Sequence, residues 1–546
     1  MDKGKGDWDS ICRDFEWKVP EYFNIAQAVC DRHAGDRSKT ALFYEDEKGH
    51  QEKYTFSELQ EKANRFANVL KGIGVEKGDR VGIVLPQRPE TAIAHIAIYK
   101  LGAIAVPMAV LFGKDALRYR LSDSAAKAVI VGKDDVHKIH DIKGELESLE
   151  KVFLVGGKPE KDEVEFDRAL EKASRSFKTA RVKADDPAII IYTSGTTGNP
   201  KGALHAHRYL LGHLTGFELS HDFFPQQGDI SWTAADWAWI GGLTDLLLPS
   251  WFYGIPVVGY RGRKFDPEKI LFLLEKYGIR NIFMPPTGLK MLRQVKNIRE
   301  RFNIGLRTIM SGGEALGAEV LNWAQEEFNV KINEIYGQTE VNYVIGNCAE
   351  IMEVRPGSMG RSYPGHVVDI IDDDGNVLPP GEAGEIAFRK GPDPVFFLNY
   401  WNNPQATQEK FKGDWACSGD TAMKDEEGYF WFKGRKDDVI ISAGYRIGPT
   451  EIEESLIRHP AVALSAVVAS PDEVRGSIVK AFVKLAAGYK PSDELARELQ
   501  EFVKKNLAAH EYPREIEFFD EIPMTTTGKI KRRDLRLLDE ERKRGK

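Results

Sequence analysis

The sequence has few cysteines and no excess of basic charge, and both features narrow the possible functions. Its four cysteines, Cys12, Cys30, Cys348 and Cys417, lie far apart and form no C-x-x-C pair. This spacing argues against a disulfide framework and structural zinc, and it is typical of a reducing compartment. The net charge is −7, whereas nucleic-acid-binding proteins normally carry a basic face. We therefore expect no nucleic-acid partner.

Long apolar runs, repeats and low-complexity tracts are also missing. The most apolar stretch, residues 237–260, is interrupted by Asp245, Pro249 and Pro256, whereas a membrane span needs roughly 20 mostly apolar residues in a row. We expect a buried helix followed by a core strand there. The first residues contain no secretory signal. The sequence thus predicts a cytoplasmic protein without stable membrane insertion, either a monomer or a homodimer.

The pattern of the first part of the chain predicts an α/β fold. A length of 546 residues is too great for one hydrophobic core, so two or more domains are expected. Leu59, Ala63, Phe66 and Leu70 recur at helical spacing, and an apolar strand follows at 81–85. This alternation continues to about residue 310 and is typical of parallel strands covered by helices on both faces. We predict a large N-terminal domain of doubly wound sheets.

After residue 360 the pattern changes. Two apolar runs, 367–371 and 384–388, are joined by an Asp-rich turn and predict an antiparallel hairpin. We expect a small β-barrel-like subdomain here, followed by a small mobile α+β domain. The predicted parts are residues 1–434, with the antiparallel subdomain at roughly 350–434, a hinge at 435–438, and the C-terminal domain at 439–546.

A loop suited to phosphate binding follows the predicted strand 188–192. It reads Thr193-Ser-Gly-Thr-Thr-Gly-Asn-Pro-Lys-Gly202. Its small residues let backbone N–H groups approach phosphate oxygens, and its lysine adds a positive charge. In the P-loop G-x-x-x-x-G-K-[ST], a glycine stands where this chain has Pro200, and a Mg²⁺-binding hydroxyl residue where it has Gly202. The metal ligand is therefore expected elsewhere.

This string resembles the signature of the adenylate-forming superfamily, which includes acyl-CoA synthetases, peptide-synthetase adenylation domains and beetle luciferases. Further motifs occur in the family's order over nearly the whole chain. The resemblance implies an AMP-forming acid–CoA ligase: ATP and a carboxylic acid give acyl-AMP and pyrophosphate, and CoA then gives acyl-CoA and AMP. ATP, Mg²⁺ and coenzyme A are the implied cofactors and cosubstrates.

The resemblance also assigns nucleotide contacts. Ser311-Gly-Gly-Glu-Ala315 resembles the segment that lines the adenine, and Glu334-Ile-Tyr-Gly-Gln-Thr-Glu340 resembles the second ATP segment. Glu340 would coordinate Mg²⁺, which prefers hard oxygen ligands, and Asp420 would bind the ribose hydroxyls. The implied ATP-binding residues are Thr193, Ser194, Gly195, Thr196, Thr197, Gly198, Lys201, Gly313, Glu314, Ala315, Glu334, Ile335, Tyr336, Gly337, Gln338, Thr339, Asp420, Arg435 and Lys529.

The C-terminal domain carries two implied faces. Lys529 would bridge the carboxylate and the α-phosphate, stabilising the charge that develops there, while Gly444 would let the pantetheine arm of CoA pass. Two faces on one domain imply rotation at the hinge Asp437 between the two half-reactions. The implied catalytic residues are Lys529, Thr339, Glu340 and Arg446. The implied CoA-binding residues are Ala443, Gly444, Tyr445, Arg475 and Arg514.

The nature of the acid is predicted from Gly337. Acetyl-CoA synthetases have tryptophan there, and its absence opens room for several methylenes, each worth roughly 0.8 kcal/mol when buried. Gly337→Trp should accordingly favour acetate. Trp237, Trp239 and Gly241 either line this acyl pocket or simply pack the core. Segments in the C-terminal domain resemble the medium-chain branch, so we expect a medium-chain, branched or aromatic acid.

Several alternatives remain at this point. One is a short-chain ligase for acetate or propionate, and another is an amino-acid adenylating module that loads a carrier protein, with Asp236 as ammonium partner. No carrier-like segment follows the small domain, however. A luciferase-like oxygenase shares the motifs. A non-enzymatic nucleotide-binding protein would not need Thr339, Glu340, Asp420 and Lys529 together.

Overall fold

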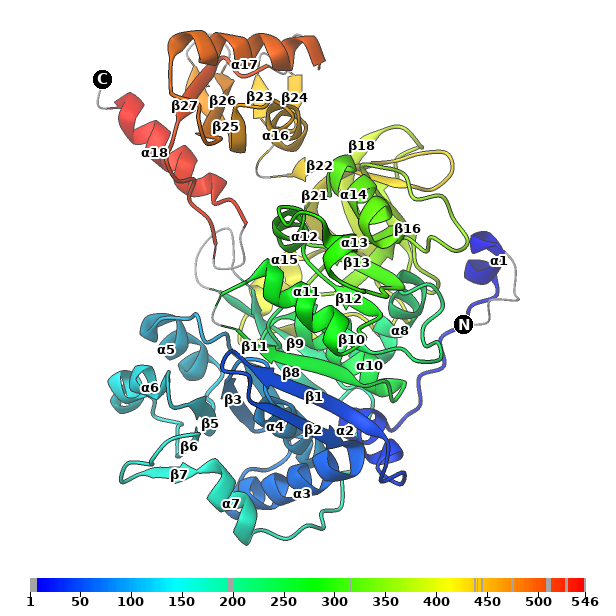
Figure 1. Cartoon of the computed structure of the whole chain (residues 1–546), viewed down its shortest axis with the longest axis vertical. Helices are drawn as coiled ribbons and strands as arrows, with labels where there is room; N and C mark the ends of the chain where they lie inside the picture. Colours follow the sequence, from blue (N-terminus) through cyan, green and yellow to red (C-terminus); the bar gives the residue numbers. More distant parts are fainter. Residues whose placement is uncertain are drawn as a thin grey trace. The chain divides into compact units, whose positions relative to one another are not determined.

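The computed structural model describes residues 7–193, 200–262, 264–314, 316–436, 438, 440–442, 445–472, 476–506, 512–525 and 529–544. The chain forms two compact units (Figure 1). The first comprises Met1–Val367 and Lys390–Phe411, and the second comprises Val368–Arg389 and Lys412–Lys546. The predicted domain boundary and hinge at 435–438 fall inside the second unit and stay predictions.

One mixed eight-stranded sheet of the first unit has the order β19-β9-β8-β4-β3-β5-β6-β7. Its strands from β8 to β7 are parallel, whereas β9 is antiparallel to both of its neighbours. The strands are β3 (Arg80–Val84), β4 (Ile104–Pro107), β5 (Ala128–Gly132), β6 (Lys151–Val155), β7 (Glu163–Glu165), β8 (Pro187–Thr193), β9 (Lys201–Ala206) and β19 (Asn399–Tyr400).

A second run of strands in this unit has the order β16-β15-β14-β13-β12-β10-β11-β1-β2. It is parallel from β14 to β1 and antiparallel at both ends. The strands are β1 (Thr40–Asp46), β2 (Gln51–Thr55), β10 (Ser231–Thr233), β11 (Val257–Arg261), β12 (Asn281–Phe283), β13 (Thr308–Gly312), β14 (Ile332–Gln338), β15 (Asn342–Gly346) and β16 (Ser358–Ser362).

Helices cover both faces of these sheets, which confirms the doubly wound prediction. The main core contains residues of α3, α4, α8 and α10 together with strands of both sheets, while α11 and α14 cover the far face of one sheet and α5 and α6 that of the other. The α-helices are α1 (Trp8–Arg13), α2 (Ile25–Val29), α3 (Phe56–Gly72), α4 (Pro89–Leu101), α5 (Lys114–Asp123), α6 (Val136–Ile142), α7 (Phe166–Lys172), α8 (Tyr209–Ser220), α9 (Ile240–Gly242), α10 (Leu248–Phe252), α11 (Pro267–Lys276), α12 (Pro286–Leu292), α13 (Ile298–Arg301), α14 (Ala318–Phe328) and α15 (Pro404–Glu409).

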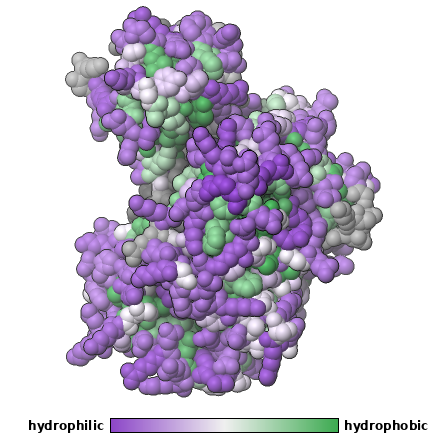
Figure 2. All heavy atoms as spheres, in the orientation of Figure 1, coloured by the Kyte–Doolittle hydropathy of each residue, from purple (hydrophilic) through white to green (hydrophobic). Residues whose placement is uncertain are grey.

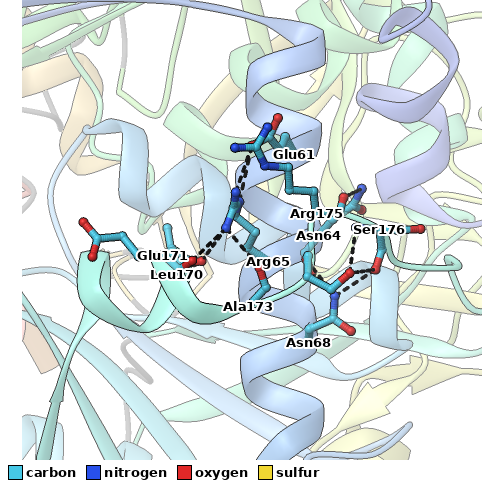
Figure 3. A network of polar contacts seen from close by, with 10 residues as sticks. Glu61, Asn64, Arg65, Asn68, Leu170, Glu171, Ala173, Arg175 and Ser176 are labelled. Carbon is cyan, nitrogen blue, oxygen red and sulfur yellow. Dashed lines mark hydrogen bonds and ion pairs between the residues drawn. The ribbon is translucent and has the colours of Figure 1, made fainter.

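Two sequence features explain α3 and the segment that follows α7. Thr55 and Glu58 form a capping box at the start of α3, which satisfies backbone donors there. Further along, Arg65 donates to the carbonyls of Leu170 (2.9 Å) and Ala173 (2.9 Å). Asn68 donates to the carbonyls of Ser174 and Ser176 (Figure 3). Side chains of α3 thus satisfy carbonyls at the end of α7, where a helix leaves them without internal partners.

The second unit contains an antiparallel ladder and an α+β region. The ladder runs β17-β18-β21-β22 and stays open: within the described ranges its end strands do not pair, so the barrel-like detail of the prediction is wrong. Strand β17 stands at the end of the strand order beside β18, so in the described part of the chain the sheet ends there instead of closing on itself. The elements are β17 (Val368–Ile371), β18 (Ala383–Arg389), β21 (Trp415–Lys424), β22 (Phe430–Arg435), β23 (Ile440–Ser442), β24 (Tyr445–Ile447), α16 (Pro449–Ile457), β25 (Val462–Asp472), β26 (Gly476–Leu485), α17 (Asp493–Asn506), β27 (Glu515–Phe518) and α18 (Arg532–Arg544), while β20 (Phe411–Lys412) spans the change of unit.

The surface fits the composition. On the face drawn in Figure 2, hydrophilic residues predominate and hydrophobic ones are scattered. Among the residues that the structure describes, no helix has both the length and the apolarity needed to cross a bilayer. In the described part of the chain, no disulfide joins any of the four cysteines.

Candidate active site

The predicted phosphate loop connects two antiparallel strands. Thr193, the last residue of β8, pairs with Lys201, the first residue of β9. The P-loop instead leads into a helix, whose N-terminus helps to bind phosphate, whereas in this chain strand β9 follows. The predicted loop residues outside the described part of the chain are Ser194, Gly195, Thr196, Thr197 and Gly198.

The two other predicted ATP segments of the first unit lie side by side. Gly312 on β13 pairs in parallel with Ile335 on β14, so the segment that starts with Gly313 and Glu314 leaves the sheet beside Glu334–Gln338. The Glu314 carboxylate accepts a hydrogen bond from Thr287 (2.8 Å). Ala315 lies outside the described residues. Parallel strands with their carboxyl ends at one edge are a common ligand-binding arrangement in α/β proteins.

Gly337 has a backbone reason to be glycine. It lies in the hairpin of β14 and β15, and a Cβ atom there would be 1.6 Å from the carbonyl oxygen of Asn342. Such an overlap forces the backbone itself to move. Gly337→Trp would therefore disturb the turn that carries Thr339 and Glu340, so it does not cleanly test acid length. The acyl-pocket role of Gly337 stays a prediction.

The turn between β14 and β15 buries the predicted metal ligand. Glu340 is 7% exposed, and the Thr339 carbonyl accepts a hydrogen bond from Tyr209 on α8 (3.4 Å). Tyr400 donates a hydrogen bond to Oε1 of Glu340, and Lys410 Nζ lies 3.9 Å from the same oxygen. Among the described residues, the hydrogen bond from Tyr400 and the closest approach of Lys410 both fall on Oε1, and a carboxylate oxygen such as Oε2 is the kind of ligand that Mg²⁺ prefers.

The second unit brings together the predicted ribose contacts. Asp420 on β21 pairs with Arg435 on β22 in the ladder, and the Arg435 Nε lies 3.6 Å from Asp420 Oδ1. The backbone N–H of Asp420 donates to Ser418 Oγ (2.9 Å). Asp420 is 6% exposed and the Arg435 side chain is 41% exposed. A buried carboxylate beside a guanidinium is suited to accept hydrogen bonds from a diol.

Lys529 lies in a short turn just before α18. Its backbone N–H donates to Thr525 Oγ1 (3.0 Å), and the Thr525 N–H donates to the Lys529 carbonyl (2.7 Å). The Lys529 side chain is exposed. Helix α18 also contacts the last residue of the predicted hinge, since Asp438 pairs with Arg536 (2.5 Å) and Arg532 (3.4 Å). Lys529 and Asp438 therefore belong to one connected part of the second unit.

The predicted CoA-binding residues are only partly described. Ala443, Gly444 and Arg475, as well as the hinge Asp437, lie outside the described residues, and for Tyr445 and Arg446 the structure gives the backbone, in β24. The guanidinium of Arg514 lies 5.1 Å from the ring of Tyr512. It also lines a cavity of about 400 Å³ with Lys480 and Arg497. These contacts leave the CoA assignments as predictions.

The three remaining acyl-pocket candidates have different surroundings. Trp237 is fully buried in the main core, which fits plain core packing. Trp239 is half-buried and contacts Phe112 edge-on, with ring centroids 5.5 Å apart. A Cβ atom at Gly241 would lie 2.7 Å from the Phe283 ring. Trp239 is therefore the best placed of the three to meet a ligand.

Sequence analysis missed several groups around Glu340. Tyr400 and Lys410 lie far from it in the chain, in a segment with no motif that points to the turn. Asp245 lies in a π-helix, η4 (Leu243–Leu247), and burial raises its pKa to about 7. A break in regular α-helix often marks a functional region, but the apolar sequence around Asp245 does not reveal it.

One cavity of the first unit is not the predicted nucleotide site. It has a volume of about 1080 Å³ and includes Arg208, Lys390 and Tyr400 in its lining, but neither Thr339 nor Glu340. Two of its lining residues, Phe397 and Tyr400, contact Glu340 in the turn.

Comparisons with family models, related proteins and solved structures all indicate the same enzyme family. Residues 30–401 match the family described as AMP-binding enzyme, and residues 451–529 match the AMP-binding enzyme C-terminal domain. The acetyl-coenzyme A synthetase of Bacillus subtilis (strain 168) is 39% identical over 97% of this chain and 93% of its own. The mitochondrial acyl-coenzyme A synthetase ACSM4 of Homo sapiens is 40% identical over 95% and 91%. The anthranilate CoA ligase AuaEII, solved with anthranoyl-AMP, has a TM-score of 0.87 and 31% identity, covering 96% of this chain and 98% of that one.

Proposed function

This chain belongs to the AMP-binding enzyme family. We propose that it activates a medium-chain, branched or aromatic acid with the nucleotide, metal and CoA residues predicted above. The protein is an AMP-forming acid–CoA ligase. A carboxylate oxygen attacks the α-phosphorus of ATP and pyrophosphate leaves. The CoA sulfur then attacks the acyl carbon, the thiol proton is released, and AMP leaves.

The observation that carries the residue assignment is the buried turn at Glu340. The hydrogen bond from Tyr400 and the closest approach of Lys410 both fall on Oε1 of its carboxylate, and an oriented carboxylate suits a Mg²⁺ site. Bound there, Mg²⁺ would offset negative charge on the phosphates of ATP. Lys201 and Thr339 contact the phosphates, Asp420 and Arg435 hold the ribose, and Lys529 stabilises the charge between the carboxylate and the α-phosphorus. Arg446 and the Gly444 face serve the CoA step.

The proposed acid is medium-chain, branched or aromatic. Support for a medium-chain acid comes from the resemblance to the medium-chain branch. Support for an aromatic acid comes from the similar structure of an anthranilate CoA ligase. The test is CoA-dependent AMP release measured for acetate, butyrate, hexanoate, isobutyrate and benzoate. We expect hexanoate or benzoate to give the highest kcat/KM, and the assignment fails if acetate exceeds both.

A pair of variants tests whether Trp239 lines the acyl site. We expect Trp239→Ala to move the optimum toward longer acids, by about fourfold in kcat/KM for each added methylene, because each buried methylene contributes roughly 0.8 kcal/mol. Trp237→Phe is the control, since Trp237 lies in the core. An unchanged chain-length profile in Trp239→Ala would remove Trp239 from the pocket.

Acetate is the second candidate for the acid substrate, because a relative of 39% identity is named acetyl-coenzyme A synthetase.

The cytoplasm is the proposed compartment, supported by the scattered positions of the four cysteines, which form no C-x-x-C pair. A monomer or homodimer is the proposed assembly, which sedimentation would test.

A further inference from the structure

A segment outside all the predicted motifs converges on Glu340. Tyr400 donates a hydrogen bond to Glu340 Oε1, Lys410 Nζ lies 3.9 Å from that oxygen, and the Phe397 N–H donates to the Glu340 carbonyl (2.8 Å). The three residues belong to one stretch, 397–410, so side chains and backbone of a single segment fix this turn.

We propose that Tyr400 and Lys410 are positioning residues that hold Oε1 of Glu340 and so present Oε2 to the divalent cation. The inference rests on the proposed function, in which Glu340 is the metal ligand. Neither side chain touches the cation in this proposal; both act through the carboxylate. Partners that orient metal ligands typically change metal affinity 10- to 100-fold when they are removed.

The contacts among Glu340, Tyr400 and Lys410 are strengthened by the low solvent exposure of these side chains. The side chains of Glu340 and Lys410 are 10% and 12% exposed, and Tyr400 is buried. Hydrogen bonds and ion pairs are stronger in such surroundings than in water.

The same residues link Glu340 to the phosphate loop. Tyr400 on β19 pairs with Ala203 on β9, the strand that follows the loop. The Trp401 N–H donates to the Gly202 carbonyl (2.7 Å), and Lys201 Nζ lies 5.3 Å from the centre of the Tyr400 ring. The Tyr400 ring thus contacts both a predicted phosphate contact and the predicted metal ligand.

Lys410 adds a second connection within the motif. Its Nζ donates to the side-chain oxygen of Gln338 (2.9 Å), two residues before Glu340. One ammonium group therefore restrains two side chains of the same turn.

The experiment is direct measurement of Mn²⁺ binding by electron paramagnetic resonance, with the full-length enzyme and α,β-methylene-ATP. We expect Tyr400→Phe and Lys410→Met each to weaken Mn²⁺ binding at least tenfold, while binding of the same nucleotide in EDTA changes less than twofold. Tyr253→Phe is the matched control, because Tyr253 donates a similar hydrogen bond to Glu218 away from the turn. It should bind Mn²⁺ as the wild type does.

The variant Glu340→Gln distinguishes the metal-ligand role of Glu340 from the positioning role of Tyr400 and Lys410. If Glu340→Gln weakens Mn²⁺ binding but Tyr400→Phe and Lys410→Met do not, the positioning role is wrong and the metal-ligand role stands. If Glu340→Gln leaves Mn²⁺ binding unchanged, both are wrong. Equal loss of Mn²⁺ and metal-free nucleotide binding in Tyr400→Phe would mean a scaffold role only and would also overturn the proposal. Should Tyr400→Phe misfold, judged by circular dichroism, Lys410→Met decides alone.

Discussion

The two charged side chains on which the proposed chemistry depends have opposite surroundings. Glu340, in the first unit, is 7% exposed and held by Tyr400 and Lys410. Lys529, in the second unit, is exposed, and its backbone N–H and carbonyl form hydrogen bonds with Thr525. The difference fits a division of labour in which the metal ligand is fixed before ATP binds and the lysine is delivered by the part that carries it.

The largest effect is expected from removing the delivered cation. Lys529→Ala should lower acyl-AMP formation about 10³-fold, since preorganised charge at the reacting phosphorus is worth that much or more. Thioester formation from supplied acyl-AMP should stay within a few-fold of wild type. The half-reactions are measured as pyrophosphate release and CoA consumption. Lys531→Ala, an exposed neighbour paired with Asp534, is the control, and equal loss of both half-reactions would contradict the comparison.

The next prediction concerns the stability that the ion pairs between α18 and Asp438 of the predicted hinge contribute. Arg532 contacts Glu453 through two nitrogens (2.5 and 3.0 Å) and also pairs with Asp438. Arg532→Met leaves two buried carboxylates without this partner, so we expect a loss of about 3–5 kcal/mol in stability. Urea unfolding measures it.

The matched change is Lys531→Met. It breaks only an exposed pair with Asp534, so its effect should be below about 1 kcal/mol. Similar losses in the Arg532 and Lys531 variants would show that the buried ion cluster does not hold the hinge side to α18.

In the first unit, the contribution of Asp245 to the free energy of unfolding should depend on pH. Burial raises the pKa of Asp245 from 3.8 to about 7, so the folded state favours the neutral carboxyl. The stability from this group is present below pH 4 and is lost as pH rises to about 7. The total is at most about 4 kcal/mol.

Asp245→Asn stays neutral at every pH. Its stability relative to wild type should therefore rise between pH 4 and pH 7 and level off above that. Urea unfolding at several pH values measures the difference. A constant difference between the two proteins from pH 4 to 8 would show that Asp245 does not titrate in this range.

The fold was largely predictable because its signals are local. Leu59, Ala63, Phe66 and Leu70 form the buried face of α3, and the apolar runs became parallel strands. The open ladder β17-β18-β21-β22 was not predictable, because strand closure depends on long-range pairing rather than on the pattern within each hairpin.

The site was predictable only where a motif is continuous in sequence. The segments at Thr193 and Glu340 were recognised as strings of residues. The roles of Tyr400 and Lys410 depend on contacts across the sheet, where strand β19 has only two residues and gives no pattern. Gly337 shows the converse: its identity suggested an open pocket, whereas the hairpin backbone at Asn342 leaves no space for a side chain.

The most direct test of the contrast between a fixed carboxylate and a delivered lysine is the hinge variant Asp437→Pro. It restricts backbone rotation at this residue and leaves Glu340 and Lys529 in place. With folding verified, acyl-AMP formation and thioester formation are measured separately. The account predicts that one half-reaction stays near the wild-type rate and the other is lost, whereas equal loss or equal retention of both would contradict it.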